Sequence, residues 1–367
     1  MKRVMIAVGT RPEAIKLCPL VQELNKRRIF EVLVCSTGQH RAMLDSALRA
    51  FDVRPDFDLD TMRTGQSSAT LAARILKGMD ELLVAEAPDL VLVQGDTTSA
   101  FAAAQAAFYR GIPVGHVEAG LRTYQMRSPF PEEMHRRGIA LLADWHFAPT
   151  VTAKKNLIRE GVPESSVFIT GNTVVDALRF TLREGKPVEQ WEIPANQRLL
   201  LFTAHQRENL GEPICGMFRA LRRIVEANPD VYAICPVHHN PAVRAAANRF
   251  LRNVPRIRTV APPEIVSFHR LMAQSYLILT DSGGIQEEAV ALGIPTVVMR
   301  YSSERNEGMR AGVLKLAGSG EEGIFEVANR LLQPNSEEYQ AMRKPSAVFG
   351  DGHASRRIAD VIERAWA

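Results

Sequence analysis

The segment Leu90-Val91-Leu92-Val93-Gln94, followed directly by Gly95-Asp96-Thr97-Thr98-Ser99, decides the fold that this sequence predicts. An apolar run of strand length ends in a small polar turn, and a helical period over residues 98–109 follows it. The same order of strand, turn and helix recurs along the chain. Strands that alternate with helices form parallel sheets with helices on both faces. The sequence therefore predicts an α/β fold.

The strands fall into two groups, which predicts two domains. Residues 182–197 between the groups are charged and contain Pro187 and Pro194, a composition typical of a connection. We therefore expect two doubly wound, Rossmann-like domains, 1–181 and 182–367, that face a cleft. In such sheets ligands bind beyond the carboxyl ends of the strands. The expected strands are 3–8, 31–36, 89–94, 113–118, 145–148 and 167–170, and then 198–203, 231–236, 257–260, 276–280 and 295–299.

Composition excludes several classes of protein. The chain has 367 residues, with 45 basic and 41 acidic side chains and a net charge of +4. The basic residues are scattered in pairs, so we expect no nucleic-acid partner. No apolar run approaches the roughly 20 residues of a membrane helix, so we expect no membrane contact. The four cysteines lie far apart, which predicts reduced thiols and a cytoplasmic protein.

Two cations stand at the first predicted turn. The segment Gly9-Thr10-Arg11-Pro12-Glu13-Ala14-Ile15-Lys16 follows the first strand and opens a helix. A helix N-terminus favours an anion, because its first N–H groups lack partners within the helix and its dipole is positive there. Arg11 and Lys16 would strengthen such a site. The alternative is an ordinary turn with two surface cations.

Four carboxylates follow at the same predicted rim. Asp96 follows an apolar strand and is a candidate for proton transfer or, alternatively, the cap of the next helix. Glu118 ends another strand, on the face that alternation also gives to His116. A carboxylate there is costly unless it is paired or transfers a proton. Glu132 and Glu133 begin a helix, where they could instead complement its dipole.

The second half supplies candidates for nucleotide binding. His205 follows a strand, as a packed, catalytic or phosphate-binding residue. The turn Ser282-Gly283-Gly284 opens a helix, and its missing side chains allow close approach of a phosphate. Glu288, one turn later, can reach a ribose diol, and Phe268 can stack on a base or fill the core. His238-His239 predicts no metal site, because adjacent strand residues point in opposite directions.

Six segments are long enough to indicate a family. Taken in order along nearly the whole chain, they are Gly-Thr-Arg-Pro-Glu-Ala-Ile-Lys (9–16), Gln-Gly-Asp-Thr-Thr-Ser (94–99), His-Val-Glu-Ala-Gly-Leu-Arg-Thr (116–123), Ser-Pro-Phe-Pro-Glu-Glu (128–133), Gly-Asn-Thr-Val-Val-Asp (171–176) and Asp-Ser-Gly-Gly-Ile-Gln-Glu-Glu (281–288). They closely resemble the motifs of the bacterial non-hydrolysing UDP-N-acetylglucosamine 2-epimerases. The hydrolysing relatives resemble a different opening motif.

The resemblance implies a glycosyltransferase-B-like fold whose last helix, at about 353–365, packs back on the first domain. It also implies a homodimer, a nucleotide-sugar substrate, and no cofactor or metal. Matching the family's catalytic residues are Asp96, Glu118, Glu132 and His205. Matching its nucleotide contacts are Arg11, Lys16, His238, Phe268, Ser282, Gly283, Gly284 and Glu288. His135 stands where the family usually has Asn.

The implied reaction is the reversible epimerisation of UDP-N-acetylglucosamine at carbon 2. The proton on that carbon is not acidic, because no carbonyl flanks it within the ring. The resemblance therefore implies that UDP leaves carbon 1 as carbon 2 loses its proton, and that both return to a 2-acetamidoglucal. The alternatives are a glycosyltransferase of the same fold, a hydrolysing epimerase that releases N-acetylmannosamine and UDP, and a nucleotide-sugar sensor.

Overall fold

The computed structural model describes residues 1–38, 41–63, 65–183, 191–204, 206 and 209–366. The chain forms two compact units, Met1–Phe180 with Gly350–Ala367, and Thr181–Phe349. The boundary predicted from the sequence lies one residue later, and residues 184–190 of the predicted connection lie outside the described residues. Among the residues that the structure describes, no helix combines the length and apolar character that a membrane span requires.

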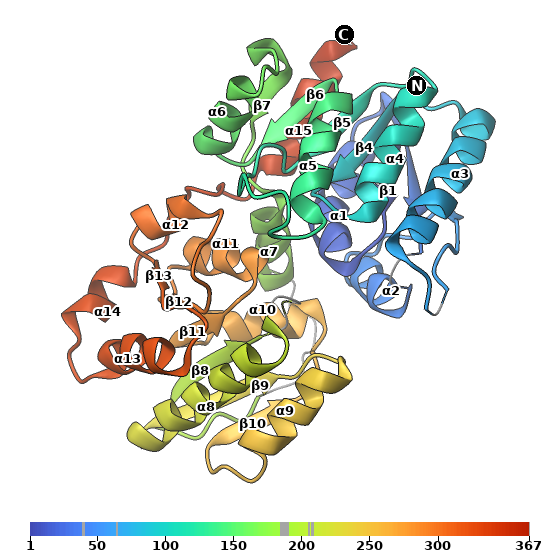
Figure 1. Ribbon diagram of the computed structural model, residues 1–367. Coiled ribbons are helices and arrows are strands. Elements are labelled where there is room, and N and C mark those ends of the chain that lie inside the picture. Colours follow the sequence, from blue (N-terminus) through green and yellow to red (C-terminus); the bar gives the residue numbers. More distant parts are fainter. Residues whose placement is uncertain (39–40, 64, 184–190, 205, 207–208, 367) are drawn as a thin grey trace. The chain divides into compact units, whose positions relative to one another are not determined.

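The first unit contains a seven-stranded sheet in the order β3-β2-β1-β4-β5-β6-β7 (Figure 1). All of its strand pairs are parallel, and β1 pairs with β2 from Lys2 opposite Phe30 to Val8 opposite Ser36. The strands are β1 (Lys2–Val8), β2 (Phe30–Ser36), β3 (Phe57–Asp58), β4 (Leu90–Gln94), β5 (Val114–Val117), β6 (Trp145–Ala148) and β7 (Val167–Ile169).

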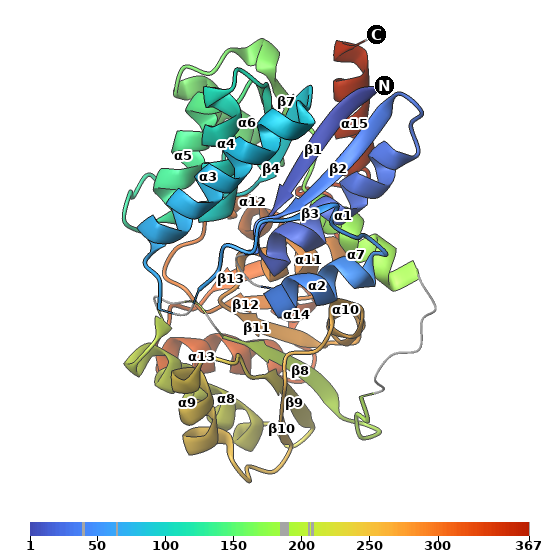
Figure 2. The same cartoon turned by 90° about the vertical axis from the view of Figure 1, so that its right-hand side faces the viewer.

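Helices cover both faces of this sheet. Met5 and Ala7 of β1 pack with apolar residues of α3, α4 and α5 on one face. Figure 2 shows these helices on one side of the sheet, with α1 and α15 on the other. The helices of the first unit are α1 (Arg11–Asn25), α2 (Arg41–Ala50), α3 (Ser68–Glu86), α4 (Thr98–Tyr109), α5 (Glu132–Leu142), α6 (Val151–Arg159), the first part of α7 (Thr173–Arg183) and α15 (Ala354–Ala365).

The final helix, α15, is anchored to the first unit at both of its ends. At its start, Asp176 accepts hydrogen bonds from the backbone N–H of Ala354 at 3.1 Å and of Ser355 at 2.8 Å. Towards its end, Arg27, which follows α1, forms ion pairs with Asp360 at 2.6 Å and with Glu363. The carboxylate of Asp176 thus replaces the partners that the first N–H groups of a helix lack.

The second unit contains a six-stranded parallel sheet in the order β10-β9-β8-β11-β12-β13. Leu200 and Phe202 of β8 face α8, α9 and α13, and Leu199 and Leu201 face α10 and α11. The strands are β8 (Arg198–Thr203), β9 (Val231–Pro236), β10 (Ile257–Val260), β11 (Leu277–Thr280), β12 (Thr296–Val298) and β13 (Leu314–Leu316). The helices are α8 (Glu212–Ala227), α9 (Pro241–Leu251), α10 (Ile265–Ala273), α11 (Gly283–Leu292), α12 (Asn306–Arg310), α13 (Glu321–Leu332) and α14 (Glu337–Met342).

Candidate active site

Glu118 lies at the carboxyl end of β5 in a network of donors. Its side chain is 5% exposed, and the carboxylate accepts hydrogen bonds from Lys16 Nζ at 2.7 and 2.6 Å and from Asn172 Nδ2 at 2.8 Å. Gln94 at the end of β4 also donates to it. A buried carboxylate is tolerated when a cation and further donors compensate its lost hydration. This network holds Glu118 as a charged group in a fixed position.

The backbone turns sharply at Glu118. The strand β5 ends at Val117, and Glu118 has a φ of 67°, in the left-handed region. The strand alternation predicted between His116 and Glu118 is therefore wrong, because it does not extend to Glu118. A non-glycine residue in this region costs free energy that its surroundings must supply. The bonds from Lys16 and Asn172 supply such a restraint.

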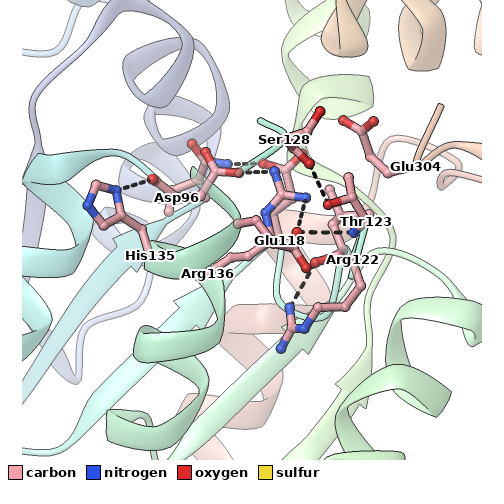
Figure 3. Close-up of polar contacts among 12 residues, drawn as sticks. Asp96, Glu118, Arg122, Thr123, Ser128, His135, Arg136 and Glu304 are labelled. Carbon is pink, nitrogen blue, oxygen red and sulfur yellow. Dashed lines mark hydrogen bonds and ion pairs between the residues drawn. The ribbon is translucent and has the colours of Figure 1, made fainter. Parts of the chain in front are cut away.

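Asp96 is held through both its side chain and its backbone (Figure 3). Arg136 of α5 forms an ion pair with its carboxylate, which remains 25% exposed. The ring of His135 donates from Nδ1 to the Asp96 carbonyl oxygen at 2.9 Å. Thr97, not Asp96, caps α4, with its hydroxyl accepting from Ala100 N at 3.0 Å. The alternative role of Asp96 as a helix cap is therefore wrong.

His116 holds the backbone of the same turn. It is fully buried, and this burial lowers the pKa of its ring to about 3, so the ring is neutral at neutral pH. Its Nε2 donates to the carbonyl oxygen of Gly95 at 2.8 Å. His116 and His135 therefore fix two successive carbonyl groups, at Gly95 and Asp96. The backbone that carries the Asp96 carboxylate is therefore held in place.

The two adjacent carboxylates at the start of α5 have different environments. Glu133 is fully buried and accepts from the backbone N–H of Thr123 at 3.0 Å and of Tyr124 at 2.9 Å. Glu132 is half-buried, and its side chain makes no hydrogen bond or ion pair with any described residue. Glu133 therefore has a structural role, and Glu132 remains available for another one.

The turn after β1 is organised by Glu13. This carboxylate is 1% exposed and accepts from the N–H of Gly9 at 2.9 Å and of Thr10 at 2.6 Å. Thr97, in the turn after β4, donates to it at 2.5 Å. One side chain therefore joins two turns at the carboxyl edge of the sheet. Arg11 is the first residue of α1, and Lys16 follows in its second turn.

Burial raises the pKa of the Glu13 carboxyl from 4.5 to about 6, which predicts a measurable pH dependence. A raised carboxyl pKa means that the folded protein binds this proton more tightly than the unfolded chain does. The resulting stability is complete below pH 4.5 and is lost as the pH rises through about 6. We expect a loss of about 2 kcal/mol in the free energy of unfolding, relative to Glu13→Gln, across this window. Urea unfolding of both proteins at pH 4.5 and 7 measures it, and an equal change in the two would contradict the assignment.

In the second unit, the turn between β11 and α11 forms an open helix start. Asp281 is fully buried and accepts from Gln206 N and Asn209 Nδ2, both at 2.9 Å. Ser282 precedes the helix without using its hydroxyl as a cap, and Gly284 has open space where a side chain would lie. Backbone N–H groups are thus available to an anion here. His205, expected at this end of β8, lies outside the described residues.

Arg305 directly precedes α12 and packs against this turn, and it was not among the residues predicted from the sequence. Its guanidinium lies against Gly283, where even a methyl group would overlap it. It is 5% exposed, and its Nε donates to the fully buried Glu287 at 2.7 Å, while Glu304 forms a second ion pair with it. A fully buried Glu on an apolar helix requires a cation, so Glu287 was the signal in the sequence that a cationic partner exists. Which cation serves as this partner depends on tertiary packing.

The remaining predicted nucleotide residues lie near the carboxyl ends of strands or on α10 and α11. Glu288 is 5% exposed on α11. Phe268 on α10 is half-buried and packs on the apolar cluster beneath the sheet. His238 follows β9, and its Nδ1 accepts from Asn240 N at 3.2 Å. Within the described ranges, no group of three or more His, Cys, Asp or Glu side chains is placed to hold a metal ion.

Comparison with known proteins gives matches over the whole chain. A family described as UDP-N-acetylglucosamine 2-epimerase matches residues 22–363. The UDP-N-acetylglucosamine 2-epimerase of Bacillus subtilis is 49% identical over 360 residues, which cover 98% of this chain and 94% of that protein. The crystal structure of the Neisseria meningitidis UDP-GlcNAc 2-epimerase bound to UDP-GlcNAc has a TM-score of 0.95 and 42% identity, and covers 99% of this chain and 100% of that one. A glycotransferase of kitacinnamycin, at 15% identity and a TM-score of 0.66, covers 99% of this chain and 98% of that one and is similar in fold alone.

Proposed function

The chain belongs to the UDP-N-acetylglucosamine 2-epimerase family, and on this premise we propose how its residues perform the reaction. The reaction interconverts UDP-N-acetylglucosamine and UDP-N-acetylmannosamine. The bond from carbon 1 to the UDP oxygen breaks with its electron pair leaving on UDP. A base takes the proton from carbon 2, and a double bond forms between carbons 1 and 2. The proton then returns to the opposite face of carbon 2, and UDP adds back to carbon 1.

The fixed, charged carboxylate of Glu118 carries this proposal. Proton transfers on two faces of a sugar need more than one acid or base. Glu118, Asp96 and Glu132 are three carboxylates from the carboxyl edge of one sheet, and each is held differently. Glu118 has Lys16 beside it, Asp96 has Arg136, and Glu132 remains half-buried without a described partner. Such differences allow the carboxylates to serve as base and acid in the same reaction.

The second unit supplies the leaving-group site in this proposal. The N–H groups at the start of α11, next to Ser282, Gly283 and Gly284, would hold the diphosphate and stabilise its developing charge. Arg11 of the first unit, and His205 and His238, would add positive or donor groups. Glu288 would bind the ribose and Phe268 the uracil. The reaction requires no metal or redox cofactor, and we propose that the protein acts in the cytoplasm as a homodimer.

The test is incubation with UDP-N-acetylglucosamine alone in deuterium oxide, followed by NMR. We expect the manno epimer with deuterium at carbon 2, because the abstracted proton exchanges with solvent before it returns. Product that keeps its original hydrogen at carbon 2 would falsify elimination and re-addition. Free N-acetylmannosamine with UDP would instead indicate the hydrolysing reaction. No epimer at all would favour a glycosyltransferase that lacks its acceptor, or a sensor.

A further inference from the structure

Glu288 contacts His269, and His269 in turn contacts Thr181. His269 of α10 lies with its Nε2 3.1 Å from Glu288 Oε1, and its Nδ1 lies 2.6 Å from the hydroxyl of Thr181. His269 is fully buried, and Glu288 is 5% exposed. Thr181 is in the last turn of α7, so three helices contribute to one chain of contacts. The proposed function uses Glu288 but neither of the other two.

The chemistry of the two groups sets the direction of the hydrogen bond between His269 and Glu288. An ionised carboxylate only accepts hydrogen bonds, so the Nε2 of His269 must donate to Glu288. The Thr181 hydroxyl can donate to Nδ1 of a neutral ring or accept from a charged one, and in both cases it fixes the plane of the ring. The position of Glu288 Oε1 is therefore set by a side chain that is itself held in place.

This arrangement leaves the two carboxylate oxygens unequal. Oε1 of Glu288 is bonded to His269, whereas Oε2 makes no hydrogen bond with the described part of the chain. The neighbouring Glu287 differs, because it pairs with Arg305. One open oxygen, held at a fixed point one turn into α11, suits a single hydroxyl of a nucleotide bound at the start of that helix.

We propose that His269, held by Thr181, positions Glu288 for a ribose hydroxyl and so makes the second unit selective for ribonucleotides over 2′-deoxyribonucleotides. The inference rests on the proposed function, which assigns the ribose to Glu288. His269 is a positioning residue, because it acts through the carboxylate. A hydrogen bond to a charged group is worth roughly tenfold or more in affinity, so its loss is measurable.

The experiment measures the dissociation constants of UDP and 2′-deoxy-UDP by calorimetry. We expect the wild type to bind UDP roughly tenfold or more tightly than 2′-deoxy-UDP. His269→Phe, which removes the donor, should bind both nucleotides about equally, at close to the wild-type affinity for 2′-deoxy-UDP. His269→Gln, whose amide can donate from a similar place, should recover part of the preference. Thr181→Val should weaken the preference and keeps the side-chain volume if His269→Phe fails to fold.

Two further variants separate the possible outcomes. Glu288→Gln should abolish the preference, and adding His269→Phe to it should change nothing more. If Glu288→Gln keeps the preference, the inference on His269 is overturned; if it also binds UDP as tightly as the wild type, the assignment of Glu288 in the proposed function fails as well. If Glu288→Gln loses the preference but His269→Phe and Thr181→Val keep it, the role of His269 is overturned while the proposed function stands. An equal loss of affinity for both nucleotides in the His269 and Thr181 variants would indicate a structural role only.

Discussion

Replacing Glu118 by glutamine is expected to lower kcat at least about 100-fold. The amide keeps the size of the side chain, and its oxygen can still accept hydrogen bonds from Asn172 and Gln94. It cannot take a proton at neutral pH. Binding of UDP alone should change less, because the proposed diphosphate and ribose contacts lie mainly in the second unit. Steady-state epimerisation and calorimetric UDP binding measure the two effects separately.

Glu118→Gln also removes the partner of Lys16, so stability must be controlled. Removing one member of a buried pair costs roughly 3–5 kcal/mol. A matched control is Glu160→Gln, because Glu160 pairs at 2.8 Å with the fully buried side chain of Arg122 and has no proposed role in the reaction. We expect Glu160→Gln to lose stability and to keep kcat within about threefold of wild type. Near-normal turnover by Glu118→Gln would remove Glu118 from the proton transfers.

The strand pattern of the sequence predicted most of both sheets. The expected strands at 145–148 and 198–203 have the bounds that the structure gives. Two strands were missed, β3 and β13, with two and three residues. The two residues of β3 are too few for any pattern, and in β13, Leu314-Lys315-Leu316, a lysine interrupts the apolar run. Each of these strands lies at one edge of its own sheet, where it pairs with a single neighbouring strand.

The sequence predicted which side chains stand at the carboxyl ends of the strands but not what they contact. The sequence placed Lys16 beside an anion, whereas the structure pairs it with Glu118, 102 positions away. The local pattern did not separate Glu132 from Glu133, and only the family resemblance selected Glu132. Tertiary packing buries Glu133 against the backbone of Thr123. Contacts of this kind depend on how distant turns meet at the edge of a sheet. A local pattern contains no information about them.

The second large effect concerns the buried ion pair beneath the start of α11. We expect Arg305→Met to lower the free energy of unfolding of the second unit by about 3–5 kcal/mol. The reason is that Glu287, 0% exposed, loses the guanidinium that donates to it at 2.7 Å. Glu304 is less affected, because Arg300 lies 3.4 Å from it. Hydrogen exchange of peptides from each unit, followed in increasing urea, assigns the loss to one unit.

Two controls decide whether the uncompensated charge causes this loss. Arg305→Met combined with Glu287→Gln removes both charges, and we expect it to be more stable than Arg305→Met alone. Arg219→Met breaks a more exposed pair with Glu321 in the same unit and should cost less than about 1 kcal/mol. If the double variant were no more stable than Arg305→Met, the loss would come from the packing of Arg305 against Gly283. The open start of α11 would then depend on the shape of this side chain, and Arg305→Met would weaken UDP binding even where the unit stays folded.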